Sequence, residues 1–166
     1  MGLSSTLSAR EEIRVEKNTD HSPWPSSCQL RTTETGQQPL PLDHFIVEDE
    51  HVYAGRHLIF DFWGASKLDE ISLMDTALRE CVAVCHATLL HIHLHHFTPN
   101  GGVSGVAVLA ESHISVHTWP ELNYAAFDVF MCGDAKPHLS VPVLEKAFSP
   151  EKVDIKTLKR GQLSGQ

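Results

Sequence analysis

The densest group of chemically versatile side chains is a histidine run at residues 91–96, which reads His-Ile-His-Leu-His-His. Alternate side chains of an extended strand share a face, so this pattern predicts His91, His93 and His95 on one face and the apolar residues between them on the other. Three imidazoles on one face can bind zinc or another transition metal. The simpler interpretation is that they line a half-polar sheet face or a subunit interface, because no zinc-protease motif is present. We expect no bound metal, and a His-rich metal-binding protein remains an alternative.

The cysteines are the next candidates for chemistry, at Cys28, Cys81, Cys85 and Cys132. They are too few and too unevenly spaced for a disulfide framework in a chain of 166 residues, and no two form a CxxC pair. Cys81 and Cys85 fall at helical spacing with neighbouring apolar residues, which predicts that they face the core. At least one of the four is therefore expected to be a working thiol.

Hydrophobic periodicity predicts the first elements that must position these groups. Residues 56–62 are a run of strand-forming residues that ends before Gly64. Ser66 and Asp69 then have the spacing of a capping box. Apolar residues recur at helical spacing from there to about His86, which predicts an amphipathic helix.

The rest of the chain alternates between strand and helix patterns. Four strand patterns follow in close succession, at residues 89–97, 103–109, 113–118 and 124–130. Their close spacing favours antiparallel pairing. A second helix is predicted from Ser140 through Phe148, and an alternating pattern over residues 153–158 predicts a last strand. The predicted order is therefore β-α-β-β-β-β-α-β.

This order predicts an α+β fold of two layers, with a largely antiparallel sheet and both helices on one face. The opposite face of the sheet then needs cover from elsewhere. A homodimer would supply that cover, and we expect His91, His93 and His95 at or near the resulting interface or at the rim of the pocket.

Length and charge limit the classes of function. A chain of 166 residues corresponds to one domain. Thirteen basic against twenty-one acidic residues give a net charge of −8, which would repel the phosphates of a nucleic acid. No apolar run approaches the roughly 20 residues of a membrane span, and no apolar stretch follows a basic start as in a secretion signal. We expect a soluble, cytoplasmic protein that binds neither nucleic acid nor membrane.

The beginning of the chain is unusually polar. Only 10 of the first 40 residues are apolar, against 42% for the whole chain. Such a composition does not offset the entropy cost of ordering a chain. We expect residues 1–45 to be a disordered, dispensable extension and residues 46–166 to form the domain.

A more specific signal lies in residues 97–106, 110–121 and 126–134. These segments contain Glu-Ser-His, then His-Thr-Trp-Pro-Glu, then Asp-Val-Phe-Met-Cys-Gly-Asp, in that order. From about Gly55 to Gly161 the chain resembles the prokaryotic S-adenosylmethionine decarboxylase proenzymes, which cleave their own chain to make a pyruvoyl cofactor. The order and spacing of the three motifs make this resemblance specific.

The resemblance implies self-cleavage between Glu111 and Ser112, into a β chain of residues 1–111 and an α chain of residues 112–166. The Ser112 hydroxyl can attack the Glu111 carbonyl in an N-to-O acyl shift, and elimination and hydrolysis then leave a pyruvoyl group at the new N-terminus. The resemblance also implies that His117 accepts and transfers the proton during processing, a task suited to an imidazole. The alternative role for His117 is packing on the sheet.

In turnover, the resemblance implies that the pyruvoyl group forms a Schiff base with the substrate amine and takes up the electrons left by carbon dioxide. It makes Cys132 the proton donor in decarboxylation, since a thiol is mostly protonated at neutral pH. It assigns Phe97 to stacking on adenine, Glu121 to the ribose hydroxyls and Ser104 to the loop that faces the reacting centre. The implied substrate is S-adenosylmethionine, and the product is the aminopropyl donor for spermidine synthesis.

A second hypothesis keeps the same chemistry with another substrate. A pyruvoyl-dependent decarboxylase of ornithine or arginine would share Ser112, His117 and Cys132 and differ only in its pocket. Phe97 and Glu121 favour a nucleoside, because neither is an obvious need for a guanidinium or a simple amine. The hypotheses are therefore the S-adenosylmethionine decarboxylase, the basic amino acid decarboxylase and the metal-binding protein.

Overall fold

The computed structural model describes residues 44–49 and 51–163, which lie within one compact unit. Two short 3-10 turns, η1 (Pro120–Leu122) and η2 (Pro137–Leu139), join strands and helices. No helix of the described residues is long and apolar enough to cross a membrane. The strands and helices follow in the order β1 (Ile46–Glu48), β2 (His51–Trp63), α1 (Ile71–Val84), β3 (Leu89–His96), β4 (Val103–Leu109), β5 (Ser112–Trp119), β6 (Tyr124–Met131), α2 (Ser140–Phe148) and β7 (Lys152–Leu163).

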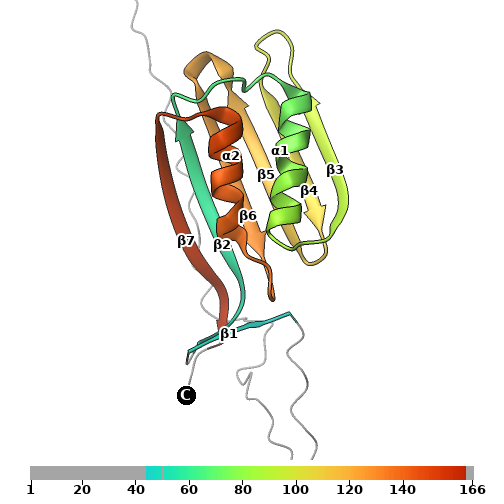
Figure 1. Cartoon of the computed structure of the whole chain (residues 1–166), viewed down its shortest axis with the longest axis vertical. Helices are drawn as coiled ribbons and strands as arrows, with labels where there is room; N and C mark the ends of the chain where they lie inside the picture. The colour runs from blue at the N-terminus through green and yellow to red at the C-terminus, as the bar shows by residue number, and fades with distance from the viewer. Residues whose placement is uncertain (1–43, 50, 164–166) are drawn as a thin grey trace, which may run out of the picture. The chain divides into compact units, whose positions relative to one another are not determined.

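The strands form one antiparallel sheet, and α1 and α2 both lie on one of its faces (Figure 1). The strand order is β1-β2-β6-β5-β4-β3, and β7 pairs with β2 on the side away from β6. The predicted α+β sandwich is confirmed, with the predicted element order preceded by the short strand β1. The second helix has the predicted bounds.

The core lies between the sheet and the two helices. Alternation along β2 and β6 sends every second side chain toward the helices, and Phe60 and Phe127 stack there with ring centroids 5.5 Å apart. Met74 and Leu78 of α1 and Phe148 of α2 are fully buried against them. Burial of each such side chain stabilises the fold by about 1.5–3 kcal/mol. This packing holds the strands that carry the expected site residues.

The first helix begins later than the sequence pattern predicts. We expected Ser66 and Asp69 to cap it, but α1 begins at Ile71, with Glu70 as the N-cap residue and no capping side-chain hydrogen bond. The Ser66 hydroxyl instead donates to the carbonyl of Phe148, 3.2 Å away. The capping prediction was wrong because the partner of Ser66 lies 82 residues further along the chain.

Four strands exceed the predicted bounds, β2 and β7 by several residues, β5 by one residue at each end and β6 by one residue at its C-terminal end. The outer strand β7 pairs with β2 from Val52 to Trp63, and this long ladder extends both strands beyond their apolar runs. The short strand β1 was not predicted. His44 and Phe45, which we assigned to a disordered extension, are among the described residues, whereas residues 1–43 lie outside them.

The face of the sheet opposite the helices is covered by no helix of the described residues (Figure 1). Large apolar groups are exposed on it, including Trp63 at 44% and Trp119 at 38%. Tyr124 lies between these two indoles, with ring centroids 4.4 and 5.2 Å away. These three rings form a partly exposed aromatic cluster on this face of the sheet.

Candidate active site

The turn between β4 and β5 presents the peptide bond between Glu111 and Ser112 at one end of the sheet. Leu109 pairs with Ser112, so Ala110 and Glu111 form a two-residue hairpin turn. Glu111 adopts φ +59°, the left-handed region that L residues with a side chain populate at a cost of about 1–2 kcal/mol. Backbone strain is therefore located at the residue whose carbonyl would be attacked.

Cys132 contacts both residues of this peptide bond from the end of β6. Its backbone N–H donates to Ser112 Oγ at 3.2 Å, and its thiol donates to the carbonyl oxygen of Glu111 at 3.2 Å. A donor on the carbonyl oxygen stabilises the negative charge that develops there when a hydroxyl attacks the carbonyl carbon. We call Glu111, Ser112 and Cys132 the turn group. Its geometry suits an N-to-O acyl shift.

The Cys132 thiol is held in its protonated form. Desolvation by burial raises its pKa above the ordinary value, and the nearby Glu111 carboxylate raises the pKa further. Both causes act in the same direction, because each disfavours the thiolate. A protonated thiol can donate a proton but is a weak nucleophile, so the site favours the acid role.

The structure places His117 far from Ser112 within one chain. His117 lies at the other end of β5, where it faces Ser104 of β4, and the Ser104 hydroxyl is 2.8 Å from His117 Nδ1. Five residues of extended strand separate His117 from Ser112, or about 16 Å. No direct proton transfer between the two is possible over this distance within one subunit.

Phe97 and Glu121 lie at the same end of the sheet as His117. Phe97 follows β3 and is 45% exposed, with its ring 4.5 Å from that of His95. Glu121 is exposed in η1, directly after β5. We call Phe97, Ser104, His117 and Glu121 the His117 group. The expected site residues therefore form two groups at opposite ends of the sheet.

The histidine run occupies β3 as the alternation predicts. His91, His93 and His95 are exposed, whereas Ile92 and Leu94 pack against the core. Among residues 44–49 and 51–163, no three His, Cys, Asp or Glu side chains are grouped so as to hold a metal ion. Nothing in the described structure therefore favours the metal-binding hypothesis.

One residue at the turn group was not singled out from the sequence. His44 Nδ1 lies 2.9 Å from Glu111 Oε2, and the carbonyl of His44 accepts a hydrogen bond from the Gly133 N–H at 2.8 Å. No sequence pattern predicts this contact, because His44 belongs to a polar stretch without periodicity and lies 67 positions before Glu111.

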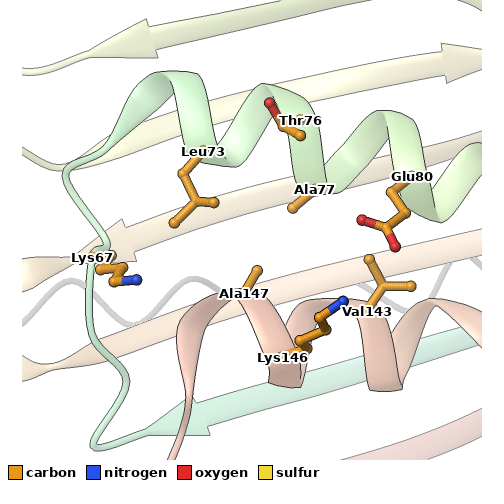
Figure 2. Close-up of a pocket in the computed structure, with 8 residues that line it drawn as sticks. All are labelled: Lys67, Leu73, Thr76, Ala77, Glu80, Val143, Lys146 and Ala147. Atoms are coloured by element: carbon orange, nitrogen blue, oxygen red, sulfur yellow. The ribbon is translucent and has the colours of Figure 1, made fainter.

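A groove of about 230 Å³ lies between α1 and α2 (Figure 2). Apolar side chains from both helices form its floor, and the charged groups are Lys67, Glu80 and Lys146. No member of the turn group or the His117 group lines it. The groove is therefore separate from the candidate active site.

Comparison with known proteins relates this geometry to one family. A model of the S-adenosylmethionine decarboxylase family matches residues 56–161. A protein of Methanococcus maripaludis named S-adenosylmethionine decarboxylase proenzyme is 48% identical over 110 residues, which cover 64% of this chain and 89% of the relative. A protein of Thermomicrobium roseum with the same name is 43% identical over 110 residues, covering 66% of this chain and 95% of the relative.

A solved structure extends the comparison to the fold. The crystal structure of the adenosylmethionine decarboxylase from Aquifex aeolicus matches with a TM-score of 0.62 and 31% sequence identity. The match covers 68% of this chain and 94% of that chain. On these matches and the shared fold, the chain belongs to the S-adenosylmethionine decarboxylase family.

Proposed function

We propose that this protein is a self-processing S-adenosylmethionine decarboxylase that cuts its own chain between Glu111 and Ser112 and turns Ser112 into a pyruvoyl group. The observation that carries the proposal is the position of Cys132, which donates hydrogen bonds to Ser112 Oγ and to the Glu111 carbonyl. These contacts support the proposal, because a serine becomes a pyruvoyl group only after its hydroxyl has attacked the preceding carbonyl, and Cys132 contacts both groups.

In processing, Ser112 Oγ attacks the carbonyl carbon of Glu111, a C–O bond forms, and the C–N bond breaks to leave an ester and a free amine. The Cys132 thiol stabilises the oxyanion at the Glu111 carbonyl oxygen. Loss of the Ser112 Cα proton then expels the Glu111 carboxylate, and hydrolysis of the resulting dehydroalanine releases ammonia. The products are a β chain of residues 1–111 and an α chain of residues 112–166.

In turnover, the pyruvoyl carbonyl supplies an electron sink for the pair of electrons left when carbon dioxide departs. Cys132 delivers a proton to the carbon that lost its carboxylate. Its raised pKa keeps that proton on the sulfur at neutral pH. Cys132 is therefore the proposed acid of the decarboxylation.

The proposed substrate contacts come from the His117 group. Phe97 is exposed enough to stack on adenine, and the exposed Glu121 carboxylate can accept hydrogen bonds from two ribose hydroxyls. Ser104 and His117 form a hydrogen-bonded pair that can relay a proton during processing. These groups act on Ser112 only if another subunit brings them to it.

We propose that a second copy of this chain completes each site. The uncovered sheet face exposes Trp63 and Trp119, and the His117 group lies at the end of the sheet opposite the turn group. A two-fold axis that packs two such faces together in opposite directions would place the turn group of one subunit beside the His117 group of the other. Because a two-fold interface repeats every contact, both sites would be completed.

A cytoplasmic location is also proposed. Cys81, Cys85 and Cys132 are free thiols, and free thiols are typical of a reducing compartment. The proposed acid role of Cys132 requires that its thiol stay reduced.

The substrate is tested by a panel of labelled amino acids. We expect the cleaved protein to release carbon dioxide from carboxyl-labelled S-adenosylmethionine and not from ornithine or arginine, because Phe97 and Glu121 suit a nucleoside. Phe97→Ala should raise KM by about tenfold, as loss of one aromatic contact costs about 1–1.5 kcal/mol. Release from arginine or ornithine alone would replace the nucleoside assignment by the basic amino acid hypothesis.

The completed site is tested by complementation between two inactive variants. Alone, Ser112→Ala should not process at all, for lack of the nucleophile, and His117→Ala should process poorly, for lack of the proton-transfer residue. In a mixed dimer, one site combines the intact Ser112 of one subunit with the intact His117 of the other. Coexpression in equal amounts should therefore cut about half of the His117→Ala chains, as random pairing in a two-fold dimer predicts.

The fragments are assigned by mass, with an affinity tag on only one variant. Sedimentation of the wild type should give a dimer. If coexpression cuts no more chain than the separate variants do, the two groups do not meet across an interface, and the proposed dimeric site is wrong.

A further inference from the structure

We propose that His44 is a positioning residue for self-cleavage, because its imidazole holds the side chain of Glu111 at the peptide bond to be cut. This inference rests on the proposed cleavage between Glu111 and Ser112. It adds a residue that the family match does not include, since that match begins at residue 56.

His44 is bound to both segments that build the turn group. Its Nδ1 lies 2.9 Å from Glu111 Oε2 in the β4–β5 turn. Its carbonyl accepts the N–H of Gly133 at 2.8 Å, and Gly133 directly follows Cys132. The histidine therefore links the segment of the attacked carbonyl to the segment of the thiol that donates to it.

The strand that follows His44 is itself fixed. In β1, Ile46 is buried and pairs with Tyr53 of β2. Glu48 accepts hydrogen bonds from the Tyr53 hydroxyl and from Arg56, both at 2.8 Å. These two hydrogen bonds, together with the nearby Lys159 ammonium, lower the pKa of Glu48 to about 2, so Glu48 stays ionised and paired over the working pH range. His44 is thus presented to Glu111 from an anchored strand.

The backbone of His44 is also unusual. Its φ of +71° lies in the left-handed region, where residues other than glycine are uncommon. Such conformations persist when surrounding contacts impose them, and they are concentrated at functional sites. Here the hydrogen bond from Gly133 and the contact with Glu111 are the contacts that hold it.

The effect on cleavage follows from the position of the Glu111 carboxylate. This negative charge belongs to the residue whose carbonyl oxygen becomes an oxyanion, so its approach to that oxygen opposes the reaction. With its proton on Nδ1, the His44 ring donates to the carboxylate in either charge state and restricts its movement toward the carbonyl oxygen. The effect is moderate, because the His44 and Glu111 side chains are 61% and 51% exposed.

The test measures the rate of self-cleavage of newly synthesised full-length chain, followed on denaturing gels after a pulse of label. We expect His44→Ala and His44→Gly to be cut about two- to fivefold more slowly than the wild type, as loss of an exposed ion pair predicts. Glycine tolerates the left-handed φ, so a slow His44→Gly assigns the loss to the imidazole and not to the backbone.

A conservative variant should restore the rate. In His44→Asn, the amide nitrogen occupies nearly the position of Nδ1, and asparagine tolerates positive φ, so cleavage should stay near the wild-type rate. His51→Ala is the matched control, because His51 is an exposed histidine of the same β1–β2 hairpin with no side-chain hydrogen bond to another described residue. It should be cut at the wild-type rate.

A double variant shows whether His44 acts through Glu111. His44→Ala combined with Glu111→Ala should be cut no more slowly than Glu111→Ala alone, because the pair is already broken. Wild-type rates for His44→Ala, or additive losses in the double variant, would overturn this inference while cleavage of the wild type upholds the proposed function. A wild-type chain that is never cut would overturn both.

Discussion

We expect purified wild-type protein to run as two bands on a denaturing gel, of residues 1–111 and 112–166, and Ser112→Ala to remain one chain without decarboxylase activity. Alanine has no hydroxyl to attack the Glu111 carbonyl, and the strained turn alone cannot break the peptide bond. The expected loss of cleavage is complete, since no other group lies in place of Ser112 Oγ. Intact mass measurement gives the position of the cut.

The new N-terminus of the shorter fragment gives a second expected result. A pyruvoyl group has no free amine, so the fragment that begins at position 112 should resist N-terminal sequencing. Ser115→Ala is a suitable control, because Ser115 is another serine of β5 and its hydroxyl donates to Asp128 rather than to the turn. It should be cut like the wild type. An uncut wild-type protein with full activity would contradict the proposed function.

Replacement of Cys132 should separate processing from turnover. In Cys132→Ala the backbone N–H that contacts Ser112 Oγ is kept, whereas the thiol on the Glu111 carbonyl is lost. Cleavage should therefore be slowed but not abolished. Decarboxylation by the cleaved variant should fall by about 10²–10⁴-fold, the usual effect of removing a well-placed acid. Single-turnover and steady-state release of carbon dioxide measure this loss.

Cys85→Ala is the matched control for that experiment. The Cys85 thiol is buried at the C-terminal end of α1, where desolvation raises its pKa to about 11, and its sulfur contacts the carbonyl of Pro137. Its removal costs packing but touches no reacting atom, so turnover per cleaved chain should be kept. Normal turnover by Cys132→Ala would show that Cys132 is a packing residue and not the acid of the decarboxylation.

Most of the fold could be predicted from the sequence, because the patterns that indicate its strands and helices are local. The strands around Phe60 and Phe127 follow the alternation of apolar residues, and the second helix begins at Ser140 as predicted. The cap of the first helix was mispredicted because the hydroxyl of Ser66 is taken by a distant carbonyl. Local spacing carries no information about such a partner.

The spatial arrangement of the site residues was harder to predict from the sequence than their identity. The motifs identify Ser112 and His117 as neighbours in sequence, but strand geometry places them about 16 Å apart. The separation of Ser112 and His117 follows from the predicted strand over residues 113–118 alone. The contact of His44 with Glu111 depends on how the chain before β2 folds onto the end of the sheet that carries the turn group. This contact needs the tertiary fold, which no single motif contains.

The strand order also determines what a cut chain would be. Residues 112–166 supply β5, β6, α2 and β7, and β2 of the longer fragment lies between β6 and β7. Neither fragment alone would form a contiguous sheet, and both fragments contribute residues to the buried hydrophobic core. Cleavage would convert a fold made by one chain into an obligate pair of interleaved chains. Unfolding of the cut protein would then also separate the two chains from each other. The stability of the mature protein would then depend on its concentration, whereas the uncut precursor subunit would fold as a single chain.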